Sequence, residues 1–305
     1  MRLLVTGKTG QVVTALIERG AVKGVEIMAM GRPELDLANS QEGLFRIAEA
    51  KPDAIVSAAA YTMVDKAETE ADLAERINSH GPAVLARLAG EIGIPIIHLS
   101  TDYVFDGSKP TPYIESDPTN PLGIYGQTKL AGERAVAKAT YSHAILRTAW
   151  VYSPFGSNFL KTILKLAATR PELRVVDDQH GNPTSALDIA DAVIKVAANL
   201  IDRPDDAALR GIFHMTGTGE ASWADFAIEI FAQSASLGGP SANVTRIGSA
   251  DYPTGAKRPA NSRLDTTKLR SIHGITMPHW RTPTHHTIAR LLAGAENQKL
   301  EEQRA

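Results

Sequence analysis

A tight glycine turn between an apolar strand and a helix constrains this chain more than any other feature. Leu3 to Thr6 is an apolar run that predicts a strand, and Gly7-Lys8-Thr9-Gly10-Gln11 then opens a helix that reaches about Arg19. In a Rossmann fold, backbone N–H groups at such a junction hold a pyrophosphate. Val13 takes the place of the usual third glycine. We therefore expect a slightly shifted helix and weaker binding, with the backbone contacts from Gly7 to Val12 retained.

The pattern that follows this turn predicts an α/β fold with a doubly wound parallel sheet. Apolar strands alternate with amphipathic helices, and continuous apolar strands joined by helical crossovers indicate a sheet that is covered on both faces. Ser40 is a candidate cap of the first amphipathic helix. The expected strands are 25–30, 54–57, 96–99 and 144–147, and the expected helices between them are 40–50 and 73–92.

The end of the second strand indicates which dinucleotide binds. An acidic residue at this place would bind the 2′-hydroxyl of NAD, but this chain has Met30-Gly31-Arg32. Arg32 can pair a 2′-phosphate with two hydrogen bonds, so the sequence favours NADPH and leaves NADH open as a second cofactor. The alternative is a solvated Arg32 in a turn. Ala58-Ala59-Ala60 follows the strand 54–57, and these small residues either let a cofactor approach closely or serve helix packing.

A looser rhythm after Trp150 predicts a smaller α/β substrate-binding domain. We expect residues 1–150, with about 172–203 returning, to form an NADP-binding Rossmann domain, and residues 151–171 and 204–305 to form the second domain. The segment 238–259 is rich in Gly, Pro and Ser and is predicted to be loop. The polar tail from Ala295 is expected to fray.

Tyr125 and Lys129 are four residues apart and share one face of a predicted helix. A cation beside a phenol lowers the phenol pKa from about 10, and a Tyr tuned in this way can exchange the proton that ketone reduction requires. Ser100-Thr101-Asp102, at the end of an apolar strand, offers a hydroxyl partner. This spacing is common in proteins, and the alternative is a surface Tyr packed on a Lys stem.

The composition excludes several other classes. Of 305 residues, 43% are hydrophobic and the net charge is −2, so there is no basic field for nucleic acid. The chain has no cysteine and its nine histidines show no metal-binding spacing, so no metal is expected. We expect no signal peptide, no membrane segment of about 20 apolar residues and a cytoplasmic location.

Seven ordered motifs resemble the dTDP-4-dehydrorhamnose reductase family, within the extended short-chain dehydrogenase/reductases, over roughly residues 2–290. Thr101-Asp102-Tyr103-Val104-Phe105-Asp106-Gly107 is the most specific of them. The others are Gly7-x-x-Gly10-Gln11, Ala58 to Glu68, Tyr125-Gly126-x-Thr128-Lys129, Arg147-Thr148-x-Trp150-Val151-Tyr152, Val176-Asp177-Asp178-Gln179-x-Gly181-x-Pro183-Thr184 and Arg258-Pro259.

This resemblance implies NADPH-dependent reduction of the C4 ketone of dTDP-4-dehydro-β-L-rhamnose to dTDP-β-L-rhamnose. That is the last step in making an activated sugar for bacterial surface polysaccharides, by a monomer or homodimer acting on a small nucleotide-sugar. Tyr125 would protonate the ketone oxygen, Thr101 would donate a hydrogen bond to it, and Lys129 would lower the Tyr125 pKa and bind the nicotinamide ribose.

The resemblance also implies a set of binding residues. The cofactor residues would be Gly7, Thr9, Gly10, Gln11, Val12, Arg32, Asp36, Leu37, Ala58, Ala59, Ala60, Thr62, Tyr125 and Lys129. The substrate residues would be Val64, Asp102, Tyr103, Trp150, Asn158 and Arg258. Trp150 would stack on an apolar ring face or be a core residue, and Arg258 would bind the diphosphate or form a structural salt bridge. Asp178 and Gln179 would face the cleft or brace a loop between the domains.

Two alternatives stay open at this point. A related epimerase or dehydratase is one, although a dehydratase typically has Asp-Glu after the strand-end Thr, whereas this chain has Asp102-Tyr103. A non-catalytic NADP-binding regulatory subunit is the other. Val13 favours that subunit, whereas the intact Thr101, Tyr125 and Lys129 weigh against it.

Overall fold

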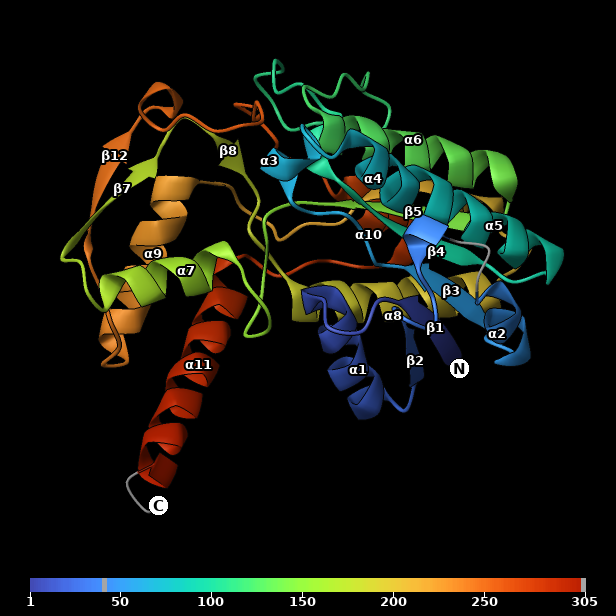
Figure 1. The fold of residues 1–305 in the computed structure, drawn as a ribbon, viewed down its shortest axis with the longest axis horizontal. Helices are drawn as coiled ribbons and strands as arrows, with labels where there is room; N and C mark the ends of the chain where they lie inside the picture. The colour runs from blue at the N-terminus through green and yellow to red at the C-terminus, as the bar shows by residue number, and fades with distance from the viewer. Residues whose placement is uncertain (40–42, 303–305) are drawn as a thin grey trace.

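A six-stranded parallel sheet is the centre of the computed structural model, which describes residues 1–39 and 43–302. The strand order is β10-β5-β4-β3-β1-β2. Helices cover both faces of this sheet (Figure 1). The prediction of a Rossmann-type, doubly wound parallel sheet is therefore confirmed. Ser40, the candidate helix cap, lies outside the described residues.

The strands of this sheet are four to six residues long. β3 and β4 are buried at every position because helices cover both faces. The chain runs from β1 outward to β2 and then crosses back to β3 on the other side of β1, which creates a switch point where open α/β sheets bind ligands. The strands are β1 (Arg2–Thr6), β2 (Glu26–Met30), β3 (Ala54–Ser57), β4 (Ile96–Thr101), β5 (His143–Thr148) and β10 (Gly211–His214).

Two groups of helices form the layers on either side. α1 (Gln11–Lys23) and α8 (Ala186–Asp202) share one apolar core with the sheet. The other face is covered by α2 (Leu44–Glu49), α5 (Gly81–Glu91) and α6 (Ile124–Ala139). Two short helices, α3 (Val64–Ala67) and α4 (Ala71–Glu75), precede α5.

The helix expected over 73–92 is not uniform. A π-helical turn, η2 (Arg76–His80), joins α4 to α5. Within it, Asn78 accepts a hydrogen bond from the N–H of Tyr61 at 2.8 Å and donates to the Tyr61 carbonyl and to Thr128 Oγ1, both at 3.1 Å. This wider turn therefore ties the loop after β3 to α6.

The second part of the molecule has its own small sheet and core, at the left of Figure 1. β7 (Glu172–Val176) and β12 (Asn243–Ile247) pair in parallel, and Phe226 and Trp280 are fully buried beside them. Its main helices are α7 (Phe159–Ala167), α9 (Trp223–Ser236) and α11 (Arg281–Glu302). The remaining elements are β6 (Val151–Tyr152), β8 (His180–Gly181), β9 (Thr184–Ser185), β11 (Ala221–Ser222), α10 (Thr267–His273), η1 (Leu37–Asn39), η3 (Asp102–Val104), η4 (Ala207–Leu209) and η5 (Ser249–Asp251). Over the described ranges, no helix is long and apolar enough to cross a membrane.

Several segments differ from the sequence-based expectation. β12 lies inside the segment 238–259, which was predicted to be loop. The strand was missed because its Gly-, Pro- and Ser-rich surroundings give no local sign of its pairing with the distant β7. β7 was expected in the Rossmann part but pairs with β12, whereas β10 joins the main sheet beside β5. The tail expected to fray continues α11 to Glu302. The division into two separate domains stays a prediction.

A buried ion pair fastens α6 to the sheet. Arg147 on β5 donates two hydrogen bonds to Glu133 on α6, at 2.9 and 2.7 Å, and both side chains are only 2% exposed. Ser100 on β4 donates to the same carboxylate at 2.5 Å. The Arg147 guanidinium also lies 5.0 Å from the centre of the Phe105 ring. One helix is thereby attached to two neighbouring strands.

We expect Arg147→Met to lower the free energy of unfolding by about 3–5 kcal/mol, because it leaves the Glu133 carboxylate buried without its cation. Urea denaturation measures this change. Arg203→Met is the matched control, since its pair with Asp206 is exposed and should contribute about 0–1 kcal/mol. Equal losses in the two variants would contradict the importance of the buried pair.

Candidate active site

The carboxyl edge of the main sheet carries a cleft of about 740 Å³. Every parallel strand of the sheet ends at this edge. The residues at the strand ends therefore lie close together: Gly7 after β1, Ala58 after β3 and Ser100 near the end of β4. Every residue predicted to bind the cofactor lines this cleft: Gly7, Thr9, Gly10, Gln11, Val12, Arg32, Asp36, Leu37, Ala58, Ala59, Ala60, Thr62, Tyr125 and Lys129. Their direct contact with a cofactor stays a prediction.

The turn after β1 has the geometry of a phosphate cradle. Gly7 has φ +102°, a conformation that favours glycine, and a Cβ there would lie 3.2 Å from Val13 Cγ2. α1 starts directly afterwards at Gln11, and its N-cap residue, Gly10, has no side chain that could occupy the first N–H groups. The first N–H groups of α1 can therefore bind an anion, which the helix dipole also favours. These residues fit a dinucleotide pyrophosphate.

Val13 packs into the core and also lines the cleft. It is 3% exposed and belongs to the core between α1, α8 and the sheet. Thr6, which the sequence analysis did not select, accepts hydrogen bonds from the N–H groups of Ala58 and Ala59, both at 3.0 Å. This hydroxyl, at the end of a buried strand, holds the alanine loop against the glycine turn.

Two cationic side chains lie at the far end of the cleft. Arg32 is exposed and lines it, as the sequence analysis required for a 2′-phosphate contact. Lys8 also lines it and forms an ion pair with Glu34. Lys8 lies inside the glycine turn itself, so its position in the motif was a usable signal that we missed. Because Glu34 offsets the charge of Lys8, the expectation of a 2′-phosphate contact rests on Arg32.

The catalytic residues expected from the sequence meet at one corner. Thr101 ends β4, whereas Tyr125 and Lys129 lie on the first two turns of α6. Burial raises the pKa of Tyr125 to about 12; the Thr101 hydroxyl opposes this rise and the Asp102 charge adds to it. The phenol therefore keeps its proton at neutral pH.

The structure gives Tyr125 a raised pKa instead of the lowered one expected beside Lys129. Lys129 reaches back to β4, where Nζ donates to the Leu99 carbonyl at 2.6 Å, and its charge is not among the influences on the phenol. Burial also lowers the pKa of Lys129 to about 8, against the charge of Glu133, which raises it. The four-residue spacing on α6 fixes only the Cα positions of Tyr125 and Lys129. The long Lys129 side chain extends from there to the Leu99 carbonyl on β4.

Thr101 and Asp102 form a short polar chain beside the phenol. The Thr101 hydroxyl donates to Asp102 Oδ1 at 2.9 Å and accepts from the Tyr103 N–H at 3.2 Å. Burial raises the pKa of Asp102 to about 6, although the Ser262 and Thr101 hydroxyls act to lower it. The Thr101 proton therefore has a partner within the protein.

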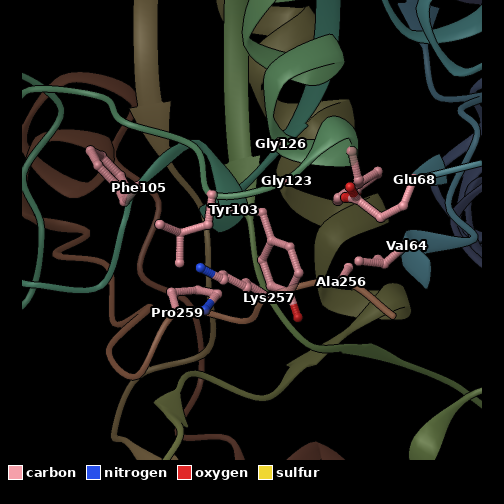
Figure 2. Close-up of a pocket in the computed structure, with 11 residues that line it drawn as sticks. Val64, Glu68, Tyr103, Phe105, Gly123, Gly126, Ala256, Lys257 and Pro259 are labelled. Carbon is pink, nitrogen blue, oxygen red and sulfur yellow. The ribbon is translucent and has the colours of Figure 1, made fainter. Parts of the chain in front are cut away.

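A second, small cavity of about 10 Å³ lies on the other side of Tyr125. Figure 2 shows Val64 and Tyr103, two of the predicted substrate residues, among the side chains that line it. The sequence analysis did not select Glu68 or Lys257, which also line it. Glu68 accepts a hydrogen bond from the N–H of Ile124 at 2.9 Å, and so it holds the start of α6.

The other predicted substrate residues are used within the protein. Arg258 donates to Asp65 at 2.9 Å, which is the structural salt bridge that the sequence left open. Trp150 has φ +47° and stacks on Trp223, with ring centroids 3.5 Å apart. Asp102 lines neither cavity.

Asn158 and the Asp178–Gln179 pair act as braces. Asn158 caps α7 through the Lys161 N–H and donates to Gln11 Oε1 at 2.8 Å, which links α7 to the start of α1. Asp178 accepts hydrogen bonds from Ser249, and Gln179 donates a hydrogen bond to the Ser249 hydroxyl at 2.9 Å. This is the bracing role that the sequence analysis gave as the alternative for Asp178 and Gln179.

Comparison with known proteins decides the family. The family model described as RmlD substrate binding domain matches residues 1–293. A dTDP-4-dehydrorhamnose reductase from Sinorhizobium fredii is 51% identical over 292 residues, which cover 96% of this chain and 98% of that protein. This chain belongs to the dTDP-4-dehydrorhamnose reductase family. The resemblance inferred from the motifs is confirmed.

Solved structures of this reductase family have the same fold. The dTDP-4-dehydrorhamnose reductase from Clostridium acetobutylicum is 38% identical, with a TM-score of 0.88 over 96% of this chain and 100% of that one. The reductase from Bacillus anthracis, solved in complex with NADP, is 33% identical, with a TM-score of 0.87 over 95% and 99% of the two chains. These relatives of the family agree with the predicted NADP cofactor and disfavour the epimerase, dehydratase and regulatory-subunit alternatives.

We expect Arg32→Ala to raise KM for NADPH about three- to tenfold and to change KM for NADH little, because only NADPH has the 2′-phosphate that Arg32 would pair. Steady-state kinetics with each cofactor measure this. The control is Arg87→Ala, which removes an exposed arginine on α5, away from Arg32 in the sequence. An equal rise for both cofactors would exclude this role for Arg32.

Proposed function

We propose that this protein reduces the C4 ketone of dTDP-4-dehydro-β-L-rhamnose with NADPH, giving dTDP-β-L-rhamnose in the final step of its synthesis. The observation that carries this proposal is the position of Tyr125, which lines both the large cleft and the small cavity. A proton donor that lines the large cleft suits transfer to a ketone held there beside the dinucleotide. Membership of the reductase family supports the same reaction.

Tyr125 is proposed as the proton donor. NADPH, when bound, supplies the hydride that goes to C4. Negative charge then develops on the ketone oxygen, and a phenol with a raised pKa still carries the proton that neutralises it. Lys129 is proposed to hold the nicotinamide ribose, because it lines the cleft while the Leu99 carbonyl anchors its ammonium.

Thr101 is proposed to orient the ketone oxygen beside Tyr125. Its hydroxyl donates a hydrogen bond to Asp102 in the structure, so donation to the substrate requires the hydroxyl to turn away from that carboxylate. Asp102 is buried and lines neither cavity, so its proposed part is to hold and release the Thr101 hydroxyl. This exchange gives both residues a part in positioning the sugar.

The remaining substrate contacts are proposed on position and chemistry. Val64 and Tyr103 line the cavity beside Tyr125 and would face the sugar. Trp150, Asn158 and Arg258 are proposed to shape the binding region through their contacts with Trp223, Gln11 and Asp65. A cytoplasmic location and a monomer or homodimer complete the proposal.

The direct test is an assay with dTDP-4-dehydrorhamnose that follows NADPH loss and identifies the product sugar by NMR. Formation of dTDP-rhamnose with one NADPH consumed per sugar is expected. Binding of NADPH without turnover would favour a regulatory subunit. Interconversion of sugars without net NADPH loss would favour an epimerase.

We expect Tyr125→Phe to lower kcat by about 10²–10⁴-fold, since the variant lacks the proton donor. Fluorescence titration should show NADPH affinity within a few-fold of wild type. Tyr141→Phe, which alters an exposed tyrosine, is the control and should keep full activity. Substantial turnover by Tyr125→Phe would assign the proton transfer to another group.

NADPH affinity should fall as pH rises through about 8, the lowered pKa of Lys129. Lys129 is charged below this pKa and neutral above it, so the ammonium that holds the ribose is lost at alkaline pH. Titration of NADPH by fluorescence between pH 6.5 and 9.5 measures this. Constant affinity across this whole range would contradict the assigned role, since a lysine with an ordinary pKa of about 10.4 stays largely charged throughout it.

A further inference from the structure

His98 is a buried histidine directly behind Lys129. It lies on β4, is 0% exposed, and pairs in register with Ser57 on β3. Its Nδ1 lies 3.1 Å from Ser57 Oγ, and its Nε2 lies 3.5 Å from Lys129 Nζ. A polar ring in such a place, joined to a group of the active site, requires an explanation beyond packing.

The contacts determine the protonation of the His98 ring. Burial, together with the charge of Lys129, holds the pKa of His98 well below its usual range, so the ring is neutral. The Lys129 ammonium has only donors, so Nε2 must present its lone pair to it. Nδ1 therefore carries the hydrogen and donates it to Ser57 Oγ. Ser57 thus selects the tautomer that can accept from lysine.

The surroundings of Lys129 leave one of its N–H groups for the cleft. The Leu99 carbonyl takes one at 2.6 Å and His98 Nε2 takes the second. The 3.5 Å contact is long for a hydrogen bond, so it orients the ammonium more than it binds it. The charged and titratable groups near Lys129 are Glu133 on α6, His98 on β4 and Arg147 on β5, which pairs with Glu133; Tyr125 lies one helical turn before Lys129 on α6.

We propose that His98 is a positioning residue for the reduction, which holds the Lys129 ammonium so that its remaining N–H points to the ribose of the dinucleotide. The inference rests on the proposed ribose contact of Lys129. Ser57 acts one step further back by fixing the ring. Because a neutral acceptor stabilises a charged lysine, His98 also keeps Lys129 protonated to higher pH.

The test compares His98→Leu, which removes the acceptor, with His98→Gln, which restores one through its amide oxygen. NADPH dissociation constants are measured by fluorescence titration from pH 6.5 to 9.5, and kcat is measured beside them. We expect His98→Leu to weaken NADPH binding by about two- to tenfold, the range of an ordinary net hydrogen bond, because the 3.5 Å contact is too long for the full strength of a charged one. The alkaline loss of binding should move to lower pH, and His98→Gln should recover most of both effects.

Three further variants separate positioning from folding. Ser57→Ala should give a smaller shift in the same direction, and it decides the question if His98→Leu does not fold. His143→Leu, at the start of the neighbouring strand β5, should leave the pH profile unchanged. In a Lys129→Met background, His98→Leu should weaken NADPH binding no further, because its effect passes through the lysine.

The outcomes that overturn the inference are distinct from those that overturn the ribose contact. If Lys129→Met leaves NADPH affinity unchanged, the ribose contact fails and the inference fails with it. If Lys129→Met weakens binding but folded His98→Leu keeps the wild-type affinity and pH profile, only the His98 inference fails. The same result follows if His143→Leu shifts the pH profile as much as His98→Leu.

Discussion

The buried carboxylate of Glu133 is the contact on which the active corner depends. It accepts two hydrogen bonds from Arg147 on β5 and one from Ser100 on β4. Glu133 lies one helical turn beyond Lys129 and two beyond Tyr125, so the strands that hold it also fix where those two side chains begin. A buried charge is costly unless it is paired, and this pairing requires one particular approach of helix to sheet.

Burial also sets the electrostatics of this corner. It shifts Tyr125, Lys129 and Asp102 toward their neutral forms, because taking a charge out of water is unfavourable. Tyr125 therefore stays protonated and can act as a proton donor. For Lys129, burial means a charge that needs acceptors, which the Leu99 carbonyl and His98 provide. Tyrosine and lysine thus act as separate groups with separate partners.

Much of the cleft was predictable, because a parallel sheet brings the ends of its strands to one edge. The glycine turn, Arg32 and the alanine loop all come there for that reason. Prediction failed where the contacts are long-range. β12 pairs with β7 and β10 joins β5, and neither pairing has a local signal. Asn158 and Arg258 likewise bind partners more than a hundred residues away, Gln11 and Asp65.

The sequence by itself determined the family, the fold class, the phosphate turn and the shared helix face of Tyr125 and Lys129. These follow from local chain geometry and from ordered motifs. Only the tertiary structure decided what those residues do to one another. It directed Lys129 to Leu99 instead of to the phenol, raised the pKa of Tyr125 instead of lowering it, and placed His98 behind the lysine. Burial and hydrogen-bond partners depend on segments that only folding brings together, so spacing along the chain cannot specify them.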